Sequence, residues 1–138
     1  LLALAGLQRL GMADVATEIL SPDQFLPAVG QGAIGITGRA DDQKTSALVG
    51  RINHAPTMVR LTAERAMLAV LDGSCRTPIA GLAELDSGGG LTLRGLVARP
   101  DGSEIFETAR SGPAADAEAM GRDAGEELRS HAGPGFFE

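Results

Sequence analysis

The stretch IAGLAELDSGGGLTLRGLVARPDGSEIFETA, residues 79–109, decides the fold of this chain. Three of its runs, at 79–85, 91–97 and 104–109, alternate apolar and other residues in the manner of half-buried strands. The links between them, DSGGG and RPDGS, carry the Gly, Asp and Pro residues of tight turns. The sequence therefore predicts a three-stranded antiparallel meander.

Two helical patterns flank this meander, at about 56–71 and 114–130. Pro56 suits the first turn of a helix and Gly73 suits a helix end. We expect the apolar residues of the first helix to contact a core, and its charged residues, Glu64 among them, to face solvent or a neighbouring surface. A three-stranded sheet needs one covered face, and two helices can cover it. The pattern predicts an α+β domain.

The residues before this domain follow a different pattern. We expect the end of a buried strand at 1–5, a second strand at 33–37, and a helix that begins after Asp41 or Asp42 as its N-cap. Such a series cannot close a core alone, so we expect an incomplete α/β segment and a domain boundary near 53–56. Because the chain begins inside an apolar run and without methionine, we expect it to be the C-terminal fragment of a longer protein.

Composition limits the classes of function. The net charge of −6 argues against a general nucleic-acid binder. No apolar run approaches the roughly 18–20 residues that cross a bilayer, so no membrane span is expected. A single cysteine in 138 residues fits a reducing cytoplasm. Of the twelve basic residues only Lys44 is a lysine, and a few well-placed arginines can hold an anionic ligand by two-point pairing.

Cys75, the only cysteine, lies in LDGSCRTPIAG (71–81), where a helical pattern ends and a strand begins. An isolated cysteine is most often a small buried residue, although a turn of this composition is usually at the surface. It could also be a reactive thiol, but the preceding helix C-terminus disfavours the thiolate. In a third interpretation the thiol is alkylated once and then serves as an anchor. Local features leave all three open.

Two further motifs are weaker. In AVGQGA (28–33) the glycines beside Gln31, Gly32 included, suit either a close ligand approach or a hinge, and the spacing matches no nucleotide-binding loop. Arg9 lies on a short helical turn, where an arginine is either a solvated charge or an anion-binding group. Two separated histidines and one cysteine form no recognisable metal-ligand set.

Taken together, LALAGLQRLG, FLPAVGQGAIGI, TAERAML, LDGSCRTPIAG and LRGLVARPDGS occur in an order that resembles the C-terminal part of the hydroxymethylbilane synthase family, also called porphobilinogen deaminase. The resemblance implies three domains, the first two similar to the lobes of periplasmic binding proteins and the third a small α+β domain. Residues 1–29 would be the tail of the second domain and 30–53 a segment that returns to the first. Residues 54–138 would be the C-terminal, cofactor-anchoring domain.

The resemblance also implies a function. Members of the family are transferases of the cytoplasm that polymerise four porphobilinogen units, with loss of ammonia, to hydroxymethylbilane in tetrapyrrole biosynthesis. Their loop cysteine, here Cys75, holds a dipyrromethane cofactor by a thioether, which favours the anchor interpretation. Substrates would be porphobilinogen and the growing polypyrrole, and the complete protein would be a monomer.

The same resemblance assigns further cofactor-binding positions. Arg9 aligns with an arginine of the cleft that neutralises pyrrole carboxylates, and Gln31 with Gly32 aligns with the interdomain connection near the substrate. Ser74 stands where many members have a second glycine and would add a hydrogen bond at the loop. The family's catalytic aspartate lies in the first domain, so no catalytic residue is assigned here and the chain alone is expected to be inactive.

Two other classes of function remain as alternatives. One is a non-catalytic α+β module that binds a partner or a small molecule and keeps Cys75 as a free surface thiol. The other is a thiol-dependent enzyme or redox switch, which predicts rapid alkylation of the cysteine near neutral pH.

Overall fold

A computed structural model describes residues 1–73 and 77–137 of the chain. The helices and strands follow one another as α1 (Leu4–Arg9), α2 (Gln43–Gly50), α3 (Ala55–Val70), β1 (Ile79–Leu85), β2 (Gly90–Ala98), β3 (Ile105–Pro113) and α4 (Ala117–Ala132). There are also two short 3₁₀ helices among the described residues. One, Ala13–Val15, is followed by the long loop that leads to α2, and the other, Ala114–Asp116, directly precedes α4. No helix within the described ranges has both the length and the apolar character needed to cross a bilayer.

The predicted meander is confirmed. The three strands pair antiparallel in the order β1-β2-β3, with Ala83 opposite Leu93 and Leu93 opposite Arg110. β3 extends beyond the predicted end at residue 109, because Gly112 and Pro113 still pair with the first residues of β2. The predicted α+β fold of this part is therefore correct.

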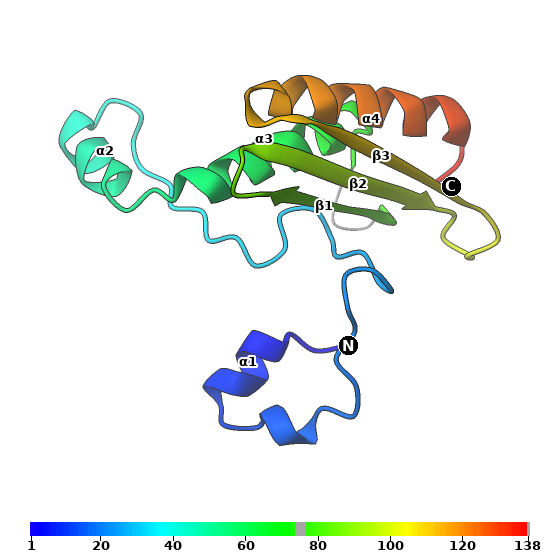
Figure 1. The fold of residues 1–138 in the computed structure, drawn as a ribbon, viewed down its shortest axis with the longest axis horizontal. Coiled ribbons are helices and arrows are strands. Elements are labelled where there is room, and N and C mark those ends of the chain that lie inside the picture. The colour runs from blue at the N-terminus through cyan, green and yellow to red at the C-terminus, as the bar shows by residue number, and fades with distance from the viewer. Residues whose placement is uncertain (74–76, 138) are drawn as a thin grey trace.

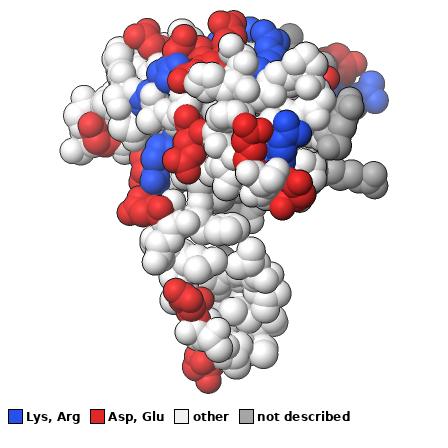
Figure 2. All heavy atoms as spheres, turned by 90° about the vertical axis from the view of Figure 1, so that its right-hand side faces the viewer, with Lys and Arg blue, Asp and Glu red and all other residues white. Residues whose placement is uncertain are grey.

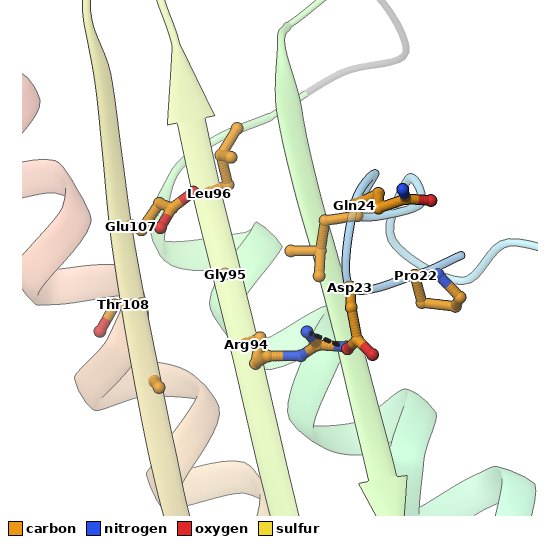
Figure 3. Close-up of a pocket in the computed structure, with 10 residues that line it drawn as sticks. Pro22, Asp23, Gln24, Arg94, Gly95, Leu96, Glu107 and Thr108 are labelled. Atoms are coloured by element: carbon orange, nitrogen blue, oxygen red, sulfur yellow. Dashed lines mark hydrogen bonds and ion pairs between the residues drawn. The ribbon is translucent and has the colours of Figure 1, made fainter. Parts of the chain in front are cut away.

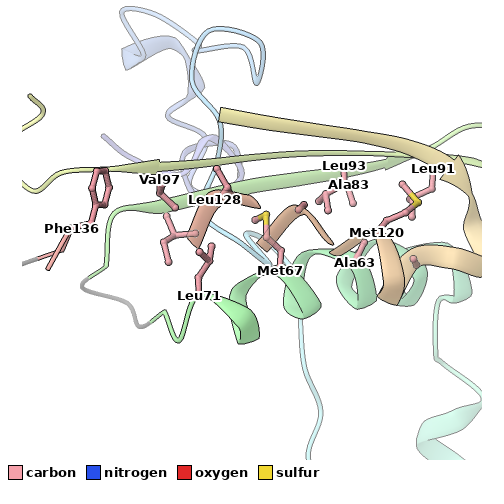
Figure 4. Packing of buried hydrophobic residues seen from close by; sticks show 13 residues of the cluster. Ala63, Met67, Leu71, Ala83, Leu91, Leu93, Val97, Met120, Leu128 and Phe136 are labelled. Carbon is pink, nitrogen blue, oxygen red and sulfur yellow. The ribbon is translucent and has the colours of Figure 1, made fainter. Parts of the chain in front are cut away.

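The core lies between one face of the sheet and the two long helices. α3 and α4 lie side by side over that face, and none of the described helices covers the opposite face (Figure 1). Alternate residues of β2, such as Leu93 and Val97, point into the core, where they meet Met67 of α3 and Leu128 of α4 (Figure 4). All four of these side chains are fully buried. The core is thus built mainly of aliphatic and methionine side chains, with Phe136 as a buried aromatic.

Two glycines allow α4 to approach α3 closely. A Cβ atom at Gly125 would lie 2.8 Å from the carbonyl oxygen of Met67, and one at Gly121 would overlap the carbonyl oxygen of Ala63. Real Cβ atoms do not approach backbone oxygens this closely. The helix contact that closes the core therefore depends on the absence of side chains at these two positions.

Charged side chains join α4 to the neighbouring strand β3. Arg110 pairs with Asp123 and, at 2.7 Å, with Glu127. The hydrogen bond from the Thr108 hydroxyl, together with that from Arg110, lowers the pKa of Glu127. Figure 2 shows that charged side chains gather over the sheet-and-helix domain, whereas on the same face the N-terminal part below it carries only a few acidic residues.

The N-terminal part differs from the prediction. Residues 1–5 are not a buried strand: Leu1 is 96% exposed, and α1 already begins at Leu4. The segment 33–37 forms no strand either, and Ile34 is 91% exposed. An isolated strand leaves its backbone groups unpaired, and no neighbouring strand accompanies this segment within the described ranges. The α/β segment expected here is therefore not seen.

The predicted helix before residue 52 does form. The Asp42 carboxylate accepts a hydrogen bond from the Thr45 amide at 3.0 Å and caps α2, as expected. However, α2 packs against no core: Leu48 within it is 56% exposed, and Ile52, which follows its end, is 69% exposed. The helix is thus specified by its cap and local propensity and contributes little to the packing of the described chain.

Candidate functional site

The motif around Gln31 folds as two overlapping turns. Gln31 donates its amide to the Ala28 carbonyl, and Ala33 donates to Gly30, each at 3.1 Å. Gly30 and Gly32 have φ values of 71° and 79°, which only glycine adopts readily. The permissive backbone predicted from the glycines is confirmed. The side chain of Gln31 is exposed at this double turn.

The double turn is attached to the C-terminal domain. Ala28 forms an isolated antiparallel bridge with Ala80 of β1, and the Gly81 amide donates to the Pro27 carbonyl at 2.9 Å. The side chain of Val29 packs against the hydrophobic core. The segment before the turn thus pairs with the outer edge of β1 at a single bridge. Figure 1 shows this segment passing along that strand.

Glu64 of α3 is the residue that sequence reasoning missed. One carboxylate oxygen accepts the Gly30 amide at 2.7 Å, and the other accepts the Ala83 amide at 2.8 Å. The residue is 6% exposed, so of the two surroundings expected for it, solvent or a neighbouring surface, only the second is found. A signal was available: it precedes Met67 by three positions and Leu71 by seven, which places it on the apolar face of the helix.

Cys75 and Ser74 lie outside the described residues, which include the two ends of their loop, Gly73 and Thr77. α3 ends one residue earlier than predicted, and the left-handed residue after it is Asp72, with φ 50°. The Gly73 amide donates to the Leu68 carbonyl at 3.3 Å, which closes a Schellman-type helix end. On its other side the loop leads into β1 beside the Ala28 bridge.

Arg9 does not lie near the double turn or the start of β1. It lies in the last turn of α1 and is exposed, and α1 is set apart from the sheet and its helices (Figure 1). Within the described ranges Arg9 forms no ion pair. Of the predicted site, the structure therefore joins the segment just before Gln31 and Gly32 to Ala80 near the start of β1, and it leaves Arg9 apart on α1.

Two hollows border this region. The first, about 400 Å³, lies on the uncovered face of the sheet beside residues 22–26, and Figure 3 shows Arg94 of β2 pointing towards Asp23 across it. That arginine is engaged, because Asp23 lies 2.9 Å away and Glu84 3.5 Å away. It is therefore a poor candidate for holding a ligand carboxylate.

The second hollow, about 1020 Å³, lies between residues 32–54 and the first half of α3. Gly32, His54 and Arg65 are among the residues that line it. The His54 ring contacts the Thr57 hydroxyl at 2.8 Å, while Arg65 has no ion-pair partner among the described residues. This arrangement can attract an anion. The described residues contain no cluster of three or more potential metal ligands.

Two family models match the chain. The model described as the porphobilinogen deaminase C-terminal domain matches residues 58–130, and the one described as the porphobilinogen deaminase dipyromethane cofactor binding domain matches residues 1–47. The first corresponds to the sheet with α3 and α4, and the second to the N-terminal part that includes Arg9 and Gln31.

Curated relatives agree with these matches. The chain is 57% identical over 137 residues to porphobilinogen deaminase of Paracoccus denitrificans and 56% identical to that of Nitrobacter winogradskyi. It is 52% identical over 141 residues to a chloroplastic porphobilinogen deaminase of Oryza sativa. These alignments cover 99–100% of the chain but only 44%, 43% and 39% of the relatives. The chain thus spans less than half the length of the proteins it matches.

Proposed function

Because this chain belongs to the porphobilinogen deaminase family, we propose that it is part of a transferase that joins four porphobilinogen units head to tail, with loss of ammonia, to hydroxymethylbilane. The observation that carries the proposal is the 57% identity to a porphobilinogen deaminase over 99% of the chain. The activity belongs to the complete protein, and the chain alone is expected to be inactive.

The proposal includes three domain assignments. Residues 1–29 would end the second domain, 30–53 would return to the first, and 54–138 would form the third. Support comes from the two family models, which leave residues 48–57 between their matches. The exposed apolar residues of the N-terminal part, Ile34 among them, are also in keeping with segments that pack against other domains.

Cys75 would supply the sulfur for the thioether to the dipyrromethane. The fit rests on its place in the chain: it is the only thiol, and the described ends of its loop, Gly73 and Thr77, are half-buried at the surface. When bound, this group provides the primer to which substrate units are added. Ser74 would support the loop by hydrogen bonding.

The carboxylates of the pyrrole side chains need cationic and polar partners. Arg9 would hold one of them, since its guanidinium is exposed and can form a two-point pair. Gln31, exposed on its double turn beside Gly32, would contact the substrate or the growing chain. We further propose that the complete protein is a monomer of the cytoplasm. The single cysteine of this 138-residue chain is in keeping with a reducing compartment.

The test uses the complete protein. Its intact mass should exceed that of the polypeptide by one covalent group, the extra mass should map to Cys75, and porphobilinogen should be consumed to give a product that colours with Ehrlich's reagent. Cys75→Ala should lose both the added mass and the activity. A bare polypeptide mass with a freely alkylated thiol would favour the non-catalytic module or the redox switch instead.

A further inference from the structure

We propose that Glu64 is a positioning residue that fixes Gly30 to the C-terminal domain, so that Gln31 moves with that domain and Gly32 is the first pivot of the connection. The proposal rests on the proposed function only where it concerns the substrate. It starts from a buried carboxylate that bonds to Ala83 within the C-terminal domain and to Gly30 outside it.

The two hydrogen bonds of Glu64 explain why a carboxylate is needed. Both of its oxygens face backbone N–H groups, one from Gly30 and one from Ala83. An ionised carboxyl group accepts at both oxygens, whereas an amide has one acceptor and one donor. Glutamine could therefore satisfy only one of the two amides and would set its own NH₂ group against the other. A buried donor left unpaired in this way is costly.

Three further contacts hold the same segment. The Ala28–Ala80 bridge, the hydrogen bond from Gly81 to Pro27 and the packing of Val29 all attach residues 27–29 to β1 and the core. Glu64 adds the last of these attachments in chain order, at Gly30. Every residue from 31 to 40 is exposed, so the attached stretch ends there.

The end of the attachment decides where the chain can turn. Gly30 and Gly32 share a left-handed backbone, but only Gly30 has its amide held by a buried side chain. A Cβ at Gly32 would meet nothing within 4 Å, whereas one at Gly30 would touch Leu61. Gly32 therefore has the space to change its conformation, and Gln31 lies on the fixed side of it.

The first test measures amide hydrogen exchange in the 138-residue chain. In Glu64→Gln we expect the Gly30 amide to exchange about 10- to 100-fold faster relative to Leu93, a core amide that reports global unfolding. Glu126→Gln is the matched control, because it makes the same change at an exposed position of α4 and should leave that ratio unchanged. A parallel rise at all amides, or no rise at Gly30, would overturn the proposal.

The second test concerns the substrate and uses the complete protein. Glu64→Gln should raise KM for porphobilinogen about 10-fold with a smaller change in kcat, and Gln31→Ala should add little in the Glu64→Gln background. Independent, multiplicative effects would mean that Glu64 does not act through Gln31. If the unsubstituted protein did not consume porphobilinogen, the proposed function would fall, while the exchange measurement would still decide the attachment.

Glu64→Asp guards against a variant that does not fold. It keeps the charge but shortens the side chain by one methylene, so it can reach one amide and not both. Because Ala83 belongs to the sheet that α3 packs against, we expect the aspartate to keep that bond and to lose the one to Gly30, whose exchange relative to Leu93 should rise about 10-fold or more. An unchanged ratio in a folded Glu64→Asp protein would count against the proposal as strongly as in the glutamine variant.

Discussion

The contact between α3 and α4 gives a sharp prediction for Gly121→Ala. The new methyl group would overlap the carbonyl oxygen of Ala63 and lie 2.7 Å from the Cβ of Ala66. Neither atom can be moved by a side-chain rotation, so the helices must separate. Overpacking of this kind costs about 3 kcal/mol at the upper end of its usual range. Replacing glycine in a helix interior returns about 1 kcal/mol.

The net loss for Gly121→Ala is therefore about 2 kcal/mol, which for a domain of this size lowers Tm by roughly 8–16 °C. Gly50→Ala is the matched control, because Gly50 ends α2 and has no atom within 4 Å of the added methyl group. It should be neutral within about 0.5 kcal/mol. Thermal and urea unfolding followed by circular dichroism measure both. If Gly121→Ala were as stable as the parent chain, the close helix contact would not exist in solution.

Three further predictions follow from the packing. The folded state lowers the pKa of Glu127, so its contribution to stability is present above the unfolded-state pKa and is lost as the pH falls through the folded-state pKa. Glu127→Gln should therefore flatten the decline of the urea midpoint as the pH falls below 4.5, the ordinary pKa of a glutamate. Gly95→Ala should cost about 1–3 kcal/mol in urea unfolding, since its methyl group would meet Met67 and lie 3.2 Å from Leu128. Hydrogen exchange should show strong protection of amides in residues 54–138 and weak protection in residues 1–26. Equal protection of both parts would contradict the exposure of the N-terminal part.

The C-terminal domain was predictable because its signals are local. Alternation defined β1 without error, and the glycine- and aspartate-rich links identified the hairpins. The Asp42 cap was predictable for the same reason, since a side chain and an amide three residues apart decide it. The strand predictions for residues 1–5 and 33–37 were wrong because an apolar run indicates that its side chains are buried in the native protein but does not identify the segment that buries them. Within the described chain no such partner is present, and the runs stay exposed.

The same distinction explains why the candidate site was only partly predictable. The glycines of the double turn fix its shape, and this could be read from the sequence. Its attachment could not, because the Glu64–Gly30 hydrogen bond joins residues 34 positions apart and leaves no periodic trace. A charged residue on an apolar helix face is the one local sign of such a bond, since burial of a carboxylate requires donors.

This attachment changes where the boundary of the C-terminal unit lies. Local patterns predict it near 53–56, close to the start of α3. Yet residues 27–30 pair with β1, contribute Val29 to the core and hydrogen bond to Glu64. They therefore belong physically to the unit formed by residues 54–137, although the exposed segment 31–53 separates them in sequence. A polypeptide cut between Gly30 and Asn53 should keep both pieces associated, whereas the same cut in Glu64→Ala should release the N-terminal piece on size-exclusion chromatography. Retention of that piece in the alanine variant would show that the contacts of residues 27–29 with β1 and the core hold it without Glu64.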